Sequence, residues 1–419
     1  MEFILLCFWT LGPFFFFFGR YPRDVGRSLF NLNNSRRERV SLQLFLNIYK
    51  LPLDDDLEIT SPHLDRLNGM FRIPFFLYTG LKHFTKNGYE SASKHFDQTT
   101  TSRDLGGCHA IVTGANQGIG FQVALELAQR NANVHMVCRN QERGTAALEQ
   151  IREQIGSSTD SPMESTLYLH IADISSLASI RKFVDEYSSA GFPLHFLINN
   201  AGLMVHDHQR SVDDYEMNFA CNTLGTYYLT KLLGPVLART STSAQNQTTT
   251  GPTPRVITVS SGGALTEALV IDDVQGEKIK HKKDFGTIQY ARDKRRQLAM
   301  TEQLAREWSG TDGSTTRRTD RVQVVAMHPG WTTTDGVKTS IPGFYESFKD
   351  KFRSLQQGAD TIVYLCCCND QALKTGEWYL DRSVQPKHLP LGGTKYSEEK
   401  AKELLHVLDK MIDDPSSTL

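Results

Sequence analysis

Between residues 109 and 380 the chain alternates short, almost wholly apolar runs with longer stretches in which apolar residues recur every three or four positions. The short runs predict strands, and because they are apolar throughout, both faces of their sheet are expected to be buried. The longer stretches predict helices that cover those faces. The expected fold class is therefore α/β, with one doubly wound parallel sheet and helices on both faces.

The predicted strands are HAIVT (109–113), NVHMVC (133–138), TLYLHI (166–171), LHFLIN (194–199), RVITVS (255–260) and RVQVVAM (321–327), with GEWYL (376–380) as a seventh candidate. The predicted helices span 118–130, 140–155, 175–188 and 286–308. Inserts rich in Ser, Thr and Gly separate a helix from the next strand at 156–165, 240–254 and 309–320. Their composition is typical of surface loops.

The N-terminal part lacks this alternation and carries an apolar leader at residues 3–18. As a helix the leader spans only about 24 Å, short of a bilayer core of about 30 Å. A signal anchor, a cleaved signal peptide and a non-native leader all remain open, although no small-residue cleavage site follows. Arginines after the leader favour a cytoplasmic location for the rest of the chain, either soluble or associated with a membrane through the leader.

We divide the chain into four parts: an extension (1–75), a helical lead-in (76–104), the α/β domain (105–390) and a C-terminal tail (391–419). The full length of 419 residues, 39% of them hydrophobic and 22% charged, suits a globular protein with a sizeable core. The formal net charge of −1 argues against a nucleic-acid partner.

The seven cysteines have no paired spacing that would indicate a disulfide framework or a metal site. They are predicted to be free thiols in a reducing compartment. The run Cys366, Cys367 and Cys368 is predicted to be buried, because free cysteine behaves as a small apolar residue.

The segment VTGANQGIG joins the first predicted strand to a helix. Thr113 and Gly114 end the strand, while Gly118 and Gly120 open the helix. Glycine lets a backbone approach a pyrophosphate closely, and a helix N-terminus offers free N–H donors. The spacing Gly-x-x-x-Gly-x-Gly differs from the common G-x-G-x-x-G pattern, but the position between strand and helix still predicts a dinucleotide site.

Arg139 follows the second predicted strand, at the place where many NAD-binding folds carry a carboxylate for the ribose 2′-hydroxyl. An arginine pairs with a 2′-phosphate, so NADP(H) is favoured over NAD(H); a surface arginine is the alternative. Asp173 ends the third strand, where it can accept from an adenine amino group or cap the next helix.

Six motifs then follow in one order: Thr113-Gly114-x-x-x-Gly118-x-Gly120, Asn199-Asn200-Ala201-Gly202, the Asn222 of CNTLG, the Ser261 of VSSGG, Tyr290-x-x-x-Lys294 and HPGWTTT. Over residues 105 to 385 the chain therefore resembles the short-chain dehydrogenase/reductase family. The resemblance implies a Rossmann-type fold, an oxidoreductase of the carbonyl reductase or alcohol dehydrogenase kind, a small-molecule carbonyl or alcohol substrate of apolar character, and a homodimer as a candidate assembly.

In that family Tyr290 would be the acid/base, and Lys294 would lower its pKa and hold the nicotinamide ribose. Ser261 would bind the substrate oxygen, Asn222 would hold a water of the proton path, and Thr334 would contact the nicotinamide carboxamide. The implied cofactor-binding residues are Thr113, Gly114, Asn116, Gly118, Ile119, Gly120, Arg139, Asp173, Asn200, Ala201, Lys294 and Thr334.

Tyr-x-x-x-Lys also occurs at 78/82, 227/231, 345/349 and 396/400. Only Tyr290 follows a strand-end serine and precedes another strand. Its charged neighbours Arg292, Asp293, Arg295 and Arg296 are predicted to be solvated or at an interface, and the Lys-rich segment 277–284 to be a solvated part of the substrate rim.

Two alternatives differ in class. A nucleotide-binding sensor or scaffold of the same fold would have no need of the proton path, and a sugar-nucleotide epimerase would usually carry a Gly-x-x-Gly-x-x-Gly turn.

Overall fold

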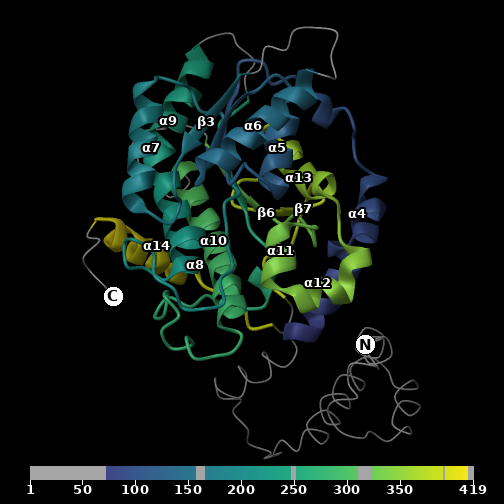
Figure 1. Cartoon of the computed structure of the whole chain (residues 1–419), viewed down its shortest axis with the longest axis vertical. Coiled ribbons are helices and arrows are strands. Elements are labelled where there is room, and N and C mark those ends of the chain that lie inside the picture. The colour runs from purple at the N-terminus through teal and green to yellow at the C-terminus, as the bar shows by residue number, and fades with distance from the viewer. Residues whose placement is uncertain (1–71, 157–165, 247–251, 310–321, 390–391, 414–419) are drawn as a thin grey trace, which may run out of the picture. The chain divides into compact units, whose positions relative to one another are not determined.

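The apolar runs become adjacent strands of one sheet in the computed structural model (Figure 1). The structure describes residues 72–156, 166–246, 252–309, 322–389 and 392–413, so the apolar leader at 3–18 lies outside the described residues. Phe75–Leu419 form one compact unit, which holds every element discussed below. Among the described residues, no helix combines the length and the apolar character needed to cross a membrane.

The sheet has the strand order β3-β2-β1-β4-β5-β6-β7-β8, and every neighbouring pair is parallel except β7 and β8. The order reverses at β1, which pairs with both β2 and β4. This reversal confirms the predicted doubly wound sheet. The strands are β1 (His109–Thr113), β2 (Asn133–Cys138), β3 (Leu167–Ile171), β4 (Phe196–Asn199), β5 (Arg255–Val259), β6 (Gln323–Met327), β7 (Trp378–Leu380) and β8 (Ser383–Val384).

Helices precede and connect these strands. They are η3 (Gly80–Phe84), α4 (Lys86–Ser93), η4 (Thr100–Ser102), α5 (Gly118–Ala128), α6 (Gln141–Gly156), α7 (Leu177–Ser189), α8 (Met217–Phe219), η5 (Ala220–Gly225), α9 (Thr226–Asn246), η6 (Gly262–Leu265), α10 (Phe285–Ser309), α11 (Asp335–Ser340), α12 (Pro342–Phe348), η7 (Lys349–Lys351), α13 (Leu355–Cys367) and α14 (Glu398–Asp413).

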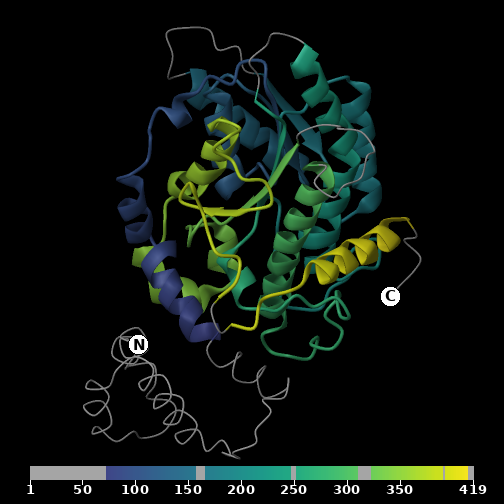
Figure 2. The ribbon, with the colours of Figure 1, turned by 180° about the vertical axis from the view of Figure 1, so that it is seen from behind.

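Helices cover both faces of the sheet (Figures 1 and 2). On one face, α5, α6 and α13 pack on the side of β1 that carries Val112. On the other, α7, α9 and α10 pack on the side that carries Ile111, and α14 lies against α10. Alternate residues of β1 thus enter different cores, which is why its sequence is apolar throughout. The six described cysteines are buried and free, as predicted.

The α9 helix extends further than the sequence indicated. Residues 240–246 were predicted to belong to a surface loop, but they form its last two turns. Thr240 is buried, donates its hydroxyl to Val236 O at 2.9 Å and accepts from Leu194 N at 2.8 Å. A tertiary hydrogen bond to the segment that leads into β4 thus overrides the loop-like composition.

β8 was not predicted, and it pairs with β7 through a two-residue turn. Asp381 and Arg382 both have positive φ, +50° and +61°, as a type I′ turn requires. Aspartate is common at the first of these two positions, but Arg382 occupies the second, where glycine is usual. Each is held by a carboxylate–guanidinium pair: Asp381 with Arg353 at 2.6 Å, and Arg382 with Asp360.

Arg353 also fixes the helical lead-in to the α/β domain. It is 1% exposed and donates to the carbonyl oxygens of His83, Phe84 and Thr85 at 2.6, 3.0 and 3.3 Å. These carbonyls lie at the end of η3, where a helix leaves its last carbonyl groups without partners. One buried guanidinium therefore joins η3 to the β7–β8 turn.

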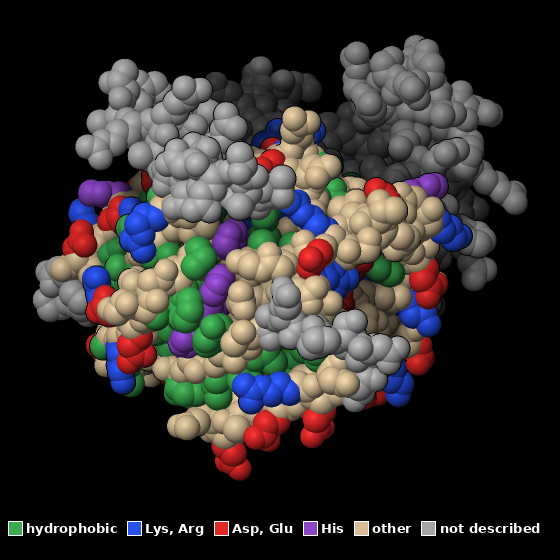
Figure 3. Space-filling model, turned by 90° about the horizontal axis from the view of Figure 1, so that it is seen from above, with side chains coloured by type: hydrophobic (Ala, Val, Ile, Leu, Met, Phe, Trp, Pro, Cys, Tyr) green, Lys and Arg blue, Asp and Glu red, His purple; other side chains and the backbone are tan. Residues whose placement is uncertain are grey.

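A row of histidine side chains crosses a hydrophobic surface on the face shown in Figure 3. Inside the sheet, imidazoles of three adjacent strands form a hydrogen-bonded row whose middle member, His135, is 0% exposed: His170 bonds to His135 at 3.0 Å and His135 to His109 at 3.0 Å. Burial lowers the pKa of His135 to about 3, and it also lowers those of the other two. The row is therefore neutral at physiological pH.

Candidate active site

The glycine-rich turn is fixed to the end of β4 by hydrogen bonds. The hydroxyl of Thr113 accepts from Asn200 N at 3.0 Å and from Ala201 N at 2.9 Å. The Asn200 amide donates to Thr113 O at 2.8 Å. Gly114 has φ +65°, which bends the chain away from β1. Thr113 and Asn200 thus shape the turn, and their polar groups are already paired within the chain.

The start of α5 leaves room and donors for an anion. Gln117 precedes the helix and makes no side-chain cap. A Cβ on Gly120 would lie 2.3 Å from Gly114 O, so only glycine allows the helix to approach the turn this closely. A Cβ on Gly118, where φ is +60°, would meet Thr334 at 3.7 Å, so Thr334 faces the turn from the start of α11. These features suit a pyrophosphate.

The other predicted nucleotide contacts lie around this turn. Asn116 and Ile119 are half-buried within it. Arg139 directly follows β2 and is exposed. Asp173 follows β3 and accepts from the backbone and hydroxyl of Ser175 at 2.8 and 2.7 Å. It does not cap α7, as one interpretation of the sequence had it, because Ser176 occupies that position.

Asn222 lies in η5, a π-helical segment between α8 and α9. Its side-chain amide pairs with the backbone of Leu203, donating to O at 2.8 Å and accepting from N at 2.9 Å. Its own backbone carbonyl accepts from the Gln297 amide at 2.7 Å. A Cβ on Gly202 would lie 3.2 Å from Asn222 Oδ1 and 3.5 Å from Lys294 Nζ, so the structure brings Asn222 and Lys294 together.

Ser261 and Tyr290 also meet. Ser261 follows β5, and its hydroxyl accepts from Gly263 N at 3.1 Å. A Cβ on Gly263 would lie 3.5 Å from Ser261 Oγ and 3.9 Å from Tyr290 Cε1. Burial raises the pKa of the Tyr290 phenol above its ordinary value, and a hydrogen bond with Ser261 opposes that rise.

Lys294 lies one turn beyond Tyr290 on α10 and is 3% exposed. Its ammonium donates to Val259 O at 2.8 Å and lies 5.4 Å from the centroid of the Tyr290 ring. Burial lowers its pKa to about 8. The predicted lowering of the Tyr290 pKa by Lys294 is not seen here, because burial of the phenol dominates and raises that pKa.

A second Tyr-x-x-x-Lys pair shows that spacing does not select the site. Lys231 Nζ lies 5.6 Å from the centroid of the Tyr227 ring, much as Lys294 lies over Tyr290. The Tyr227 hydroxyl, however, donates to Asp409 of α14 at 2.7 Å. Its environment is a helix–helix contact, whereas Tyr290 meets the strand-end Ser261.

The charges around Tyr290 correct the prediction of solvated side chains. Asp293, Arg295 and Arg296 are each 0% exposed, and the Arg292 side chain is 12% exposed. Each guanidinium contacts the segment that follows Ser261: Arg292 pairs with Asp273 at 3.1 Å, Arg295 donates to Glu267 O, and Arg296 donates to Val270 O. Periodicity could not reveal this, because the partners lie in an irregular segment.

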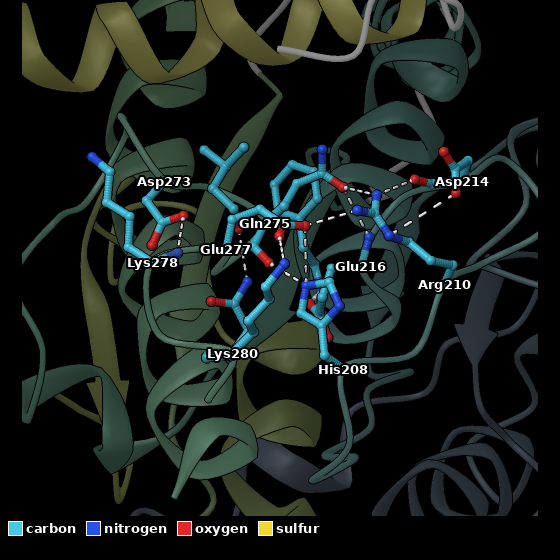
Figure 4. Close-up of polar contacts among 12 residues, drawn as sticks. His208, Arg210, Asp214, Glu216, Asp273, Gln275, Glu277, Lys278 and Lys280 are labelled. Atoms are coloured by element: carbon cyan, nitrogen blue, oxygen red, sulfur yellow. Dashed lines mark hydrogen bonds and ion pairs between the residues drawn. The ribbon is translucent and has the colours of Figure 1, made fainter. Parts of the chain in front are cut away.

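The start of the Lys-rich segment 277–284 is held by hydrogen bonds and ion pairs. Figure 4 shows His208 and Arg210 turned toward Gln275 and Glu277. Arg210 donates to Glu277 at 2.7 Å and to Gln275 Oε1 at 3.2 Å, and His208 Nε2 lies 3.3 Å from Gln275 O. Lys280 adds an exposed pair with Glu277 at 2.9 Å. The segment thus joins the loop before α8.

His328, of the motif HPGWTTT, also supports Ser261 and was not singled out from the sequence. It is buried, and its Nδ1 accepts from Gly262 N at 3.1 Å. Its Nε2 has no polar partner, but the ring meets Phe84 edge to face with centroids 4.4 Å apart. A residue of the lead-in thus packs behind the catalytic serine candidate.

Comparison with known proteins decides the family. The family model for short chain dehydrogenase matches residues 108–268. Dehydrogenase/reductase SDR family member 12 of Homo sapiens is 37% identical over 343 residues, which cover 82% of this chain and 98% of that protein. The chain belongs to the short-chain dehydrogenase/reductase family. Membership makes it an NAD(P)-dependent oxidoreductase.

More distant relatives agree. Retinol dehydrogenase 12 of Mus musculus is 30% identical over 284 residues, 67% of this chain and 80% of that protein. An uncharacterized protein from Mycobacterium paratuberculosis of known crystal structure is 22% identical and covers 74% of this chain and 95% of its own, with a TM-score of 0.54. That likeness concerns the fold alone.

Proposed function

We propose that the protein is an NADP(H)-dependent carbonyl reductase or alcohol dehydrogenase with Tyr290 as its acid/base. One observation carries the proposal: Ser261 after β5, Asn222 of η5, and Tyr290 and Lys294 of α10 meet beside the glycine-rich turn. A phenol, a hydroxyl and an ammonium at one point can bind and protonate a carbonyl oxygen.

The residues of the turn fit a dinucleotide. The backbone N–H groups at the start of α5 would receive the pyrophosphate, and the exposed Arg139 would pair with a 2′-phosphate. Thr334 and Lys294 would contact the nicotinamide half: Thr334 follows β6 and Lys294 bonds to β5, on the other side of β1 in the sheet from β2, which Arg139 follows. When bound, the nicotinamide supplies the hydride.

Tyr290 is suited to donate a proton. Because burial raises the pKa of its phenol, the hydroxyl is protonated at neutral pH and can give its proton to a developing alkoxide. Ser261 would hold the same oxygen. Lys294, whose pKa is about 8, is still mostly charged at pH 7 and stabilises the phenolate left behind. We therefore propose reduction of the carbonyl as the favoured direction at neutral pH.

The substrate is proposed to be apolar, of lipid, retinoid or steroid type. Aromatic side chains of α12 gather beside Trp331: Phe344 and Phe348 lie 4.9 and 5.2 Å from it between ring centroids. They belong to the segment that begins at Thr334, which faces the glycine-rich turn. The name of the retinol dehydrogenase relative supports the same class.

The second candidate is a nucleotide-binding sensor without catalysis. The proximity of Tyr290, Ser261 and Asn222 disfavours it, because a module that only binds nucleotide has no need of a proton path. The discriminating experiment follows NADPH absorbance with a panel of retinal, steroid and long-chain aldehyde or ketone substrates. Turnover of any of them supports the enzyme, whereas nucleotide binding with no turnover across the panel supports the sensor.

A further inference from the structure

Asp293 is a buried carboxyl that the proposed chemistry leaves unused. It lies on α10 between Tyr290 and Lys294 and is 0% exposed. Its pKa is raised to about 7, first because burial disfavours the charged form. A carboxyl placed at such cost directly beside an acid/base pair calls for a reason.

The contacts of Asp293 reach the segment that carries Asn222. One carboxylate oxygen accepts from the Thr223 hydroxyl at 2.8 Å and from Arg296 at 2.8 Å. Thr223 follows Asn222 in η5, and Gln297, one turn further along α10, donates to Asn222 O at 2.7 Å. Two side chains four residues apart share a helix face, so α10 holds two successive residues of η5.

The hydrogen bonds from Asp293 and Gln297 to η5 fix the distance between Asn222 and Lys294. A π-helical segment departs from regular backbone hydrogen bonding and needs tertiary contacts to keep one shape. The contacts from Asp293 and Gln297 supply them from the helix that carries Tyr290 and Lys294. The two halves of the site therefore cannot shift independently.

Charged groups face Asp293 from several elements. On α10 these are Arg296, which also donates to Asp273 O, and Lys294. A second buried carboxyl, Glu216, faces Asp293 from the residue before α8. The titratable thiol of Cys221 faces it from η5; its pKa is raised to about 12, so this thiol is neutral. Asp273, in the segment that follows Ser261, is paired with Arg292.

The buried pair with Arg296 is not explained by stability. Both side chains are 0% exposed, and a buried ion pair is often no more stable than apolar residues of similar volume. The negative charge does act on the site: it raises the pKa of both Tyr290 and Lys294.

We propose that Asp293 is a positioning residue, which joins η5 to α10 through Thr223 and places a negative charge between Tyr290 and Lys294 on α10. The proposal rests on the proposed function, because it assumes that those two residues exchange the proton. Asp293 touches neither substrate nor nucleotide.

The test is the pH profile of kcat/KM for carbonyl reduction by Asp293→Asn. Asparagine keeps the shape and an oxygen for Thr223 but removes the charge, so the alkaline limb should move to lower pH by about one unit. Activity at pH 6 should stay within about threefold of the wild type. If the alkaline limb of Asp293→Asn lies at the same pH as that of the wild type, the proposed role of the Asp293 charge is overturned.

Two further variants complete the test. Glu302→Gln removes a carboxylate on the same helix about 14 Å beyond Asp293, and the alkaline limb of this variant should not move. Thr223→Val removes the bond to Asp293 without a change of charge, so kcat should fall about tenfold with the limb in place, and an unchanged kcat would overturn the positioning role. If Asp293→Asn does not fold, the kcat of Thr223→Val alone decides whether Asp293 has the positioning role.

Failure of the inference is distinguishable from failure of the proposed function. If Tyr290→Phe is inactive while the Asp293→Asn profile matches the wild type, only the inference falls. If Tyr290→Phe retains full activity, the proposed function falls first.

Discussion

The ammonium of Lys294 lies over the ring of Tyr290, 5.4 Å from its centroid, but donates to the carbonyl oxygen of Val259 at 2.8 Å. Among the ion pairs of the described residues none involves Lys294. A buried ammonium with one backbone acceptor is poorly compensated, which is why its pKa is lowered to about 8. We propose that Lys294 serves the reaction at the expense of stability.

Lys294→Met is expected to inactivate the enzyme and to raise its Tm by roughly 2 °C at pH 7, because methionine fills the space without a buried charge. Differential scanning calorimetry measures the shift. Equal or lower stability of the variant would contradict the account of the site.

The same variant has a pH signature. The folded-state pKa of Lys294 is about 8 and that of an exposed lysine is about 10.4, so in this interval the unfolded chain binds more protons. Wild-type stability from this group therefore rises between pH 8 and pH 10, and the advantage of Lys294→Met should shrink there. Melting at pH 7 and pH 9.5 checks the sign.

The two reaction directions should respond oppositely to pH. Reduction needs the protonated Tyr290, whose pKa is raised by burial, and the protonated Lys294. Its rate should be flat near neutral pH and fall above about pH 8, while oxidation of the alcohol should rise. Initial rates between pH 6 and pH 10 test this, and an oxidation rate highest at pH 6 would oppose it.

Arg139→Glu is expected to raise the Kd for NADPH at least tenfold and to leave that for NADH within about threefold, because it removes the proposed partner of a 2′-phosphate. Arg152→Glu makes the same charge change on an exposed part of α6 and should alter neither. Nucleotide titration by fluorescence measures both. Tighter NADH than NADPH binding by the wild type would refute the preference.

Arg353→Met should destabilise the protein by about 3–5 kcal/mol, because it leaves Asp381 buried without its partner and removes the donor to His83 O at the end of η3. Lys349→Met, at an exposed pair close by, should change stability by less than about 1 kcal/mol. Urea unfolding compares them. Equal effects would show that the lead-in is not anchored as described.

The sheet was predictable because its evidence is local: β1 and β2 have the bounds expected, since buried parallel strands are apolar throughout. The β7–β8 hairpin could not be predicted, because its turn residues Asp381 and Arg382 have positive φ and are held by ion pairs with residues distant in the sequence. The helical end of α9 was missed for the same reason.

Some features of the candidate site could also be predicted from the sequence, and others could not. The positions of Gly114, Ser261 and Tyr290 followed from motif order, which places them at one edge of a parallel sheet. The burial of Asp293 and Arg296 did not, because a charged residue looks solvated until its partners in η5 and the segment after Ser261 are known. The rise in the pKa of Tyr290 likewise depends on tertiary burial.

The most direct test of the central claim is NADPH-dependent carbonyl reduction by Tyr290→Phe beside Tyr227→Phe. Both variants remove one hydroxyl from a Tyr-x-x-x-Lys pair with a lysine above the ring, but Tyr227 faces Asp409 and not Ser261. The account predicts that Tyr290→Phe binds NADPH normally and loses at least about 100-fold in kcat, while Tyr227→Phe keeps wild-type kcat. Wild-type kcat in Tyr290→Phe would contradict it.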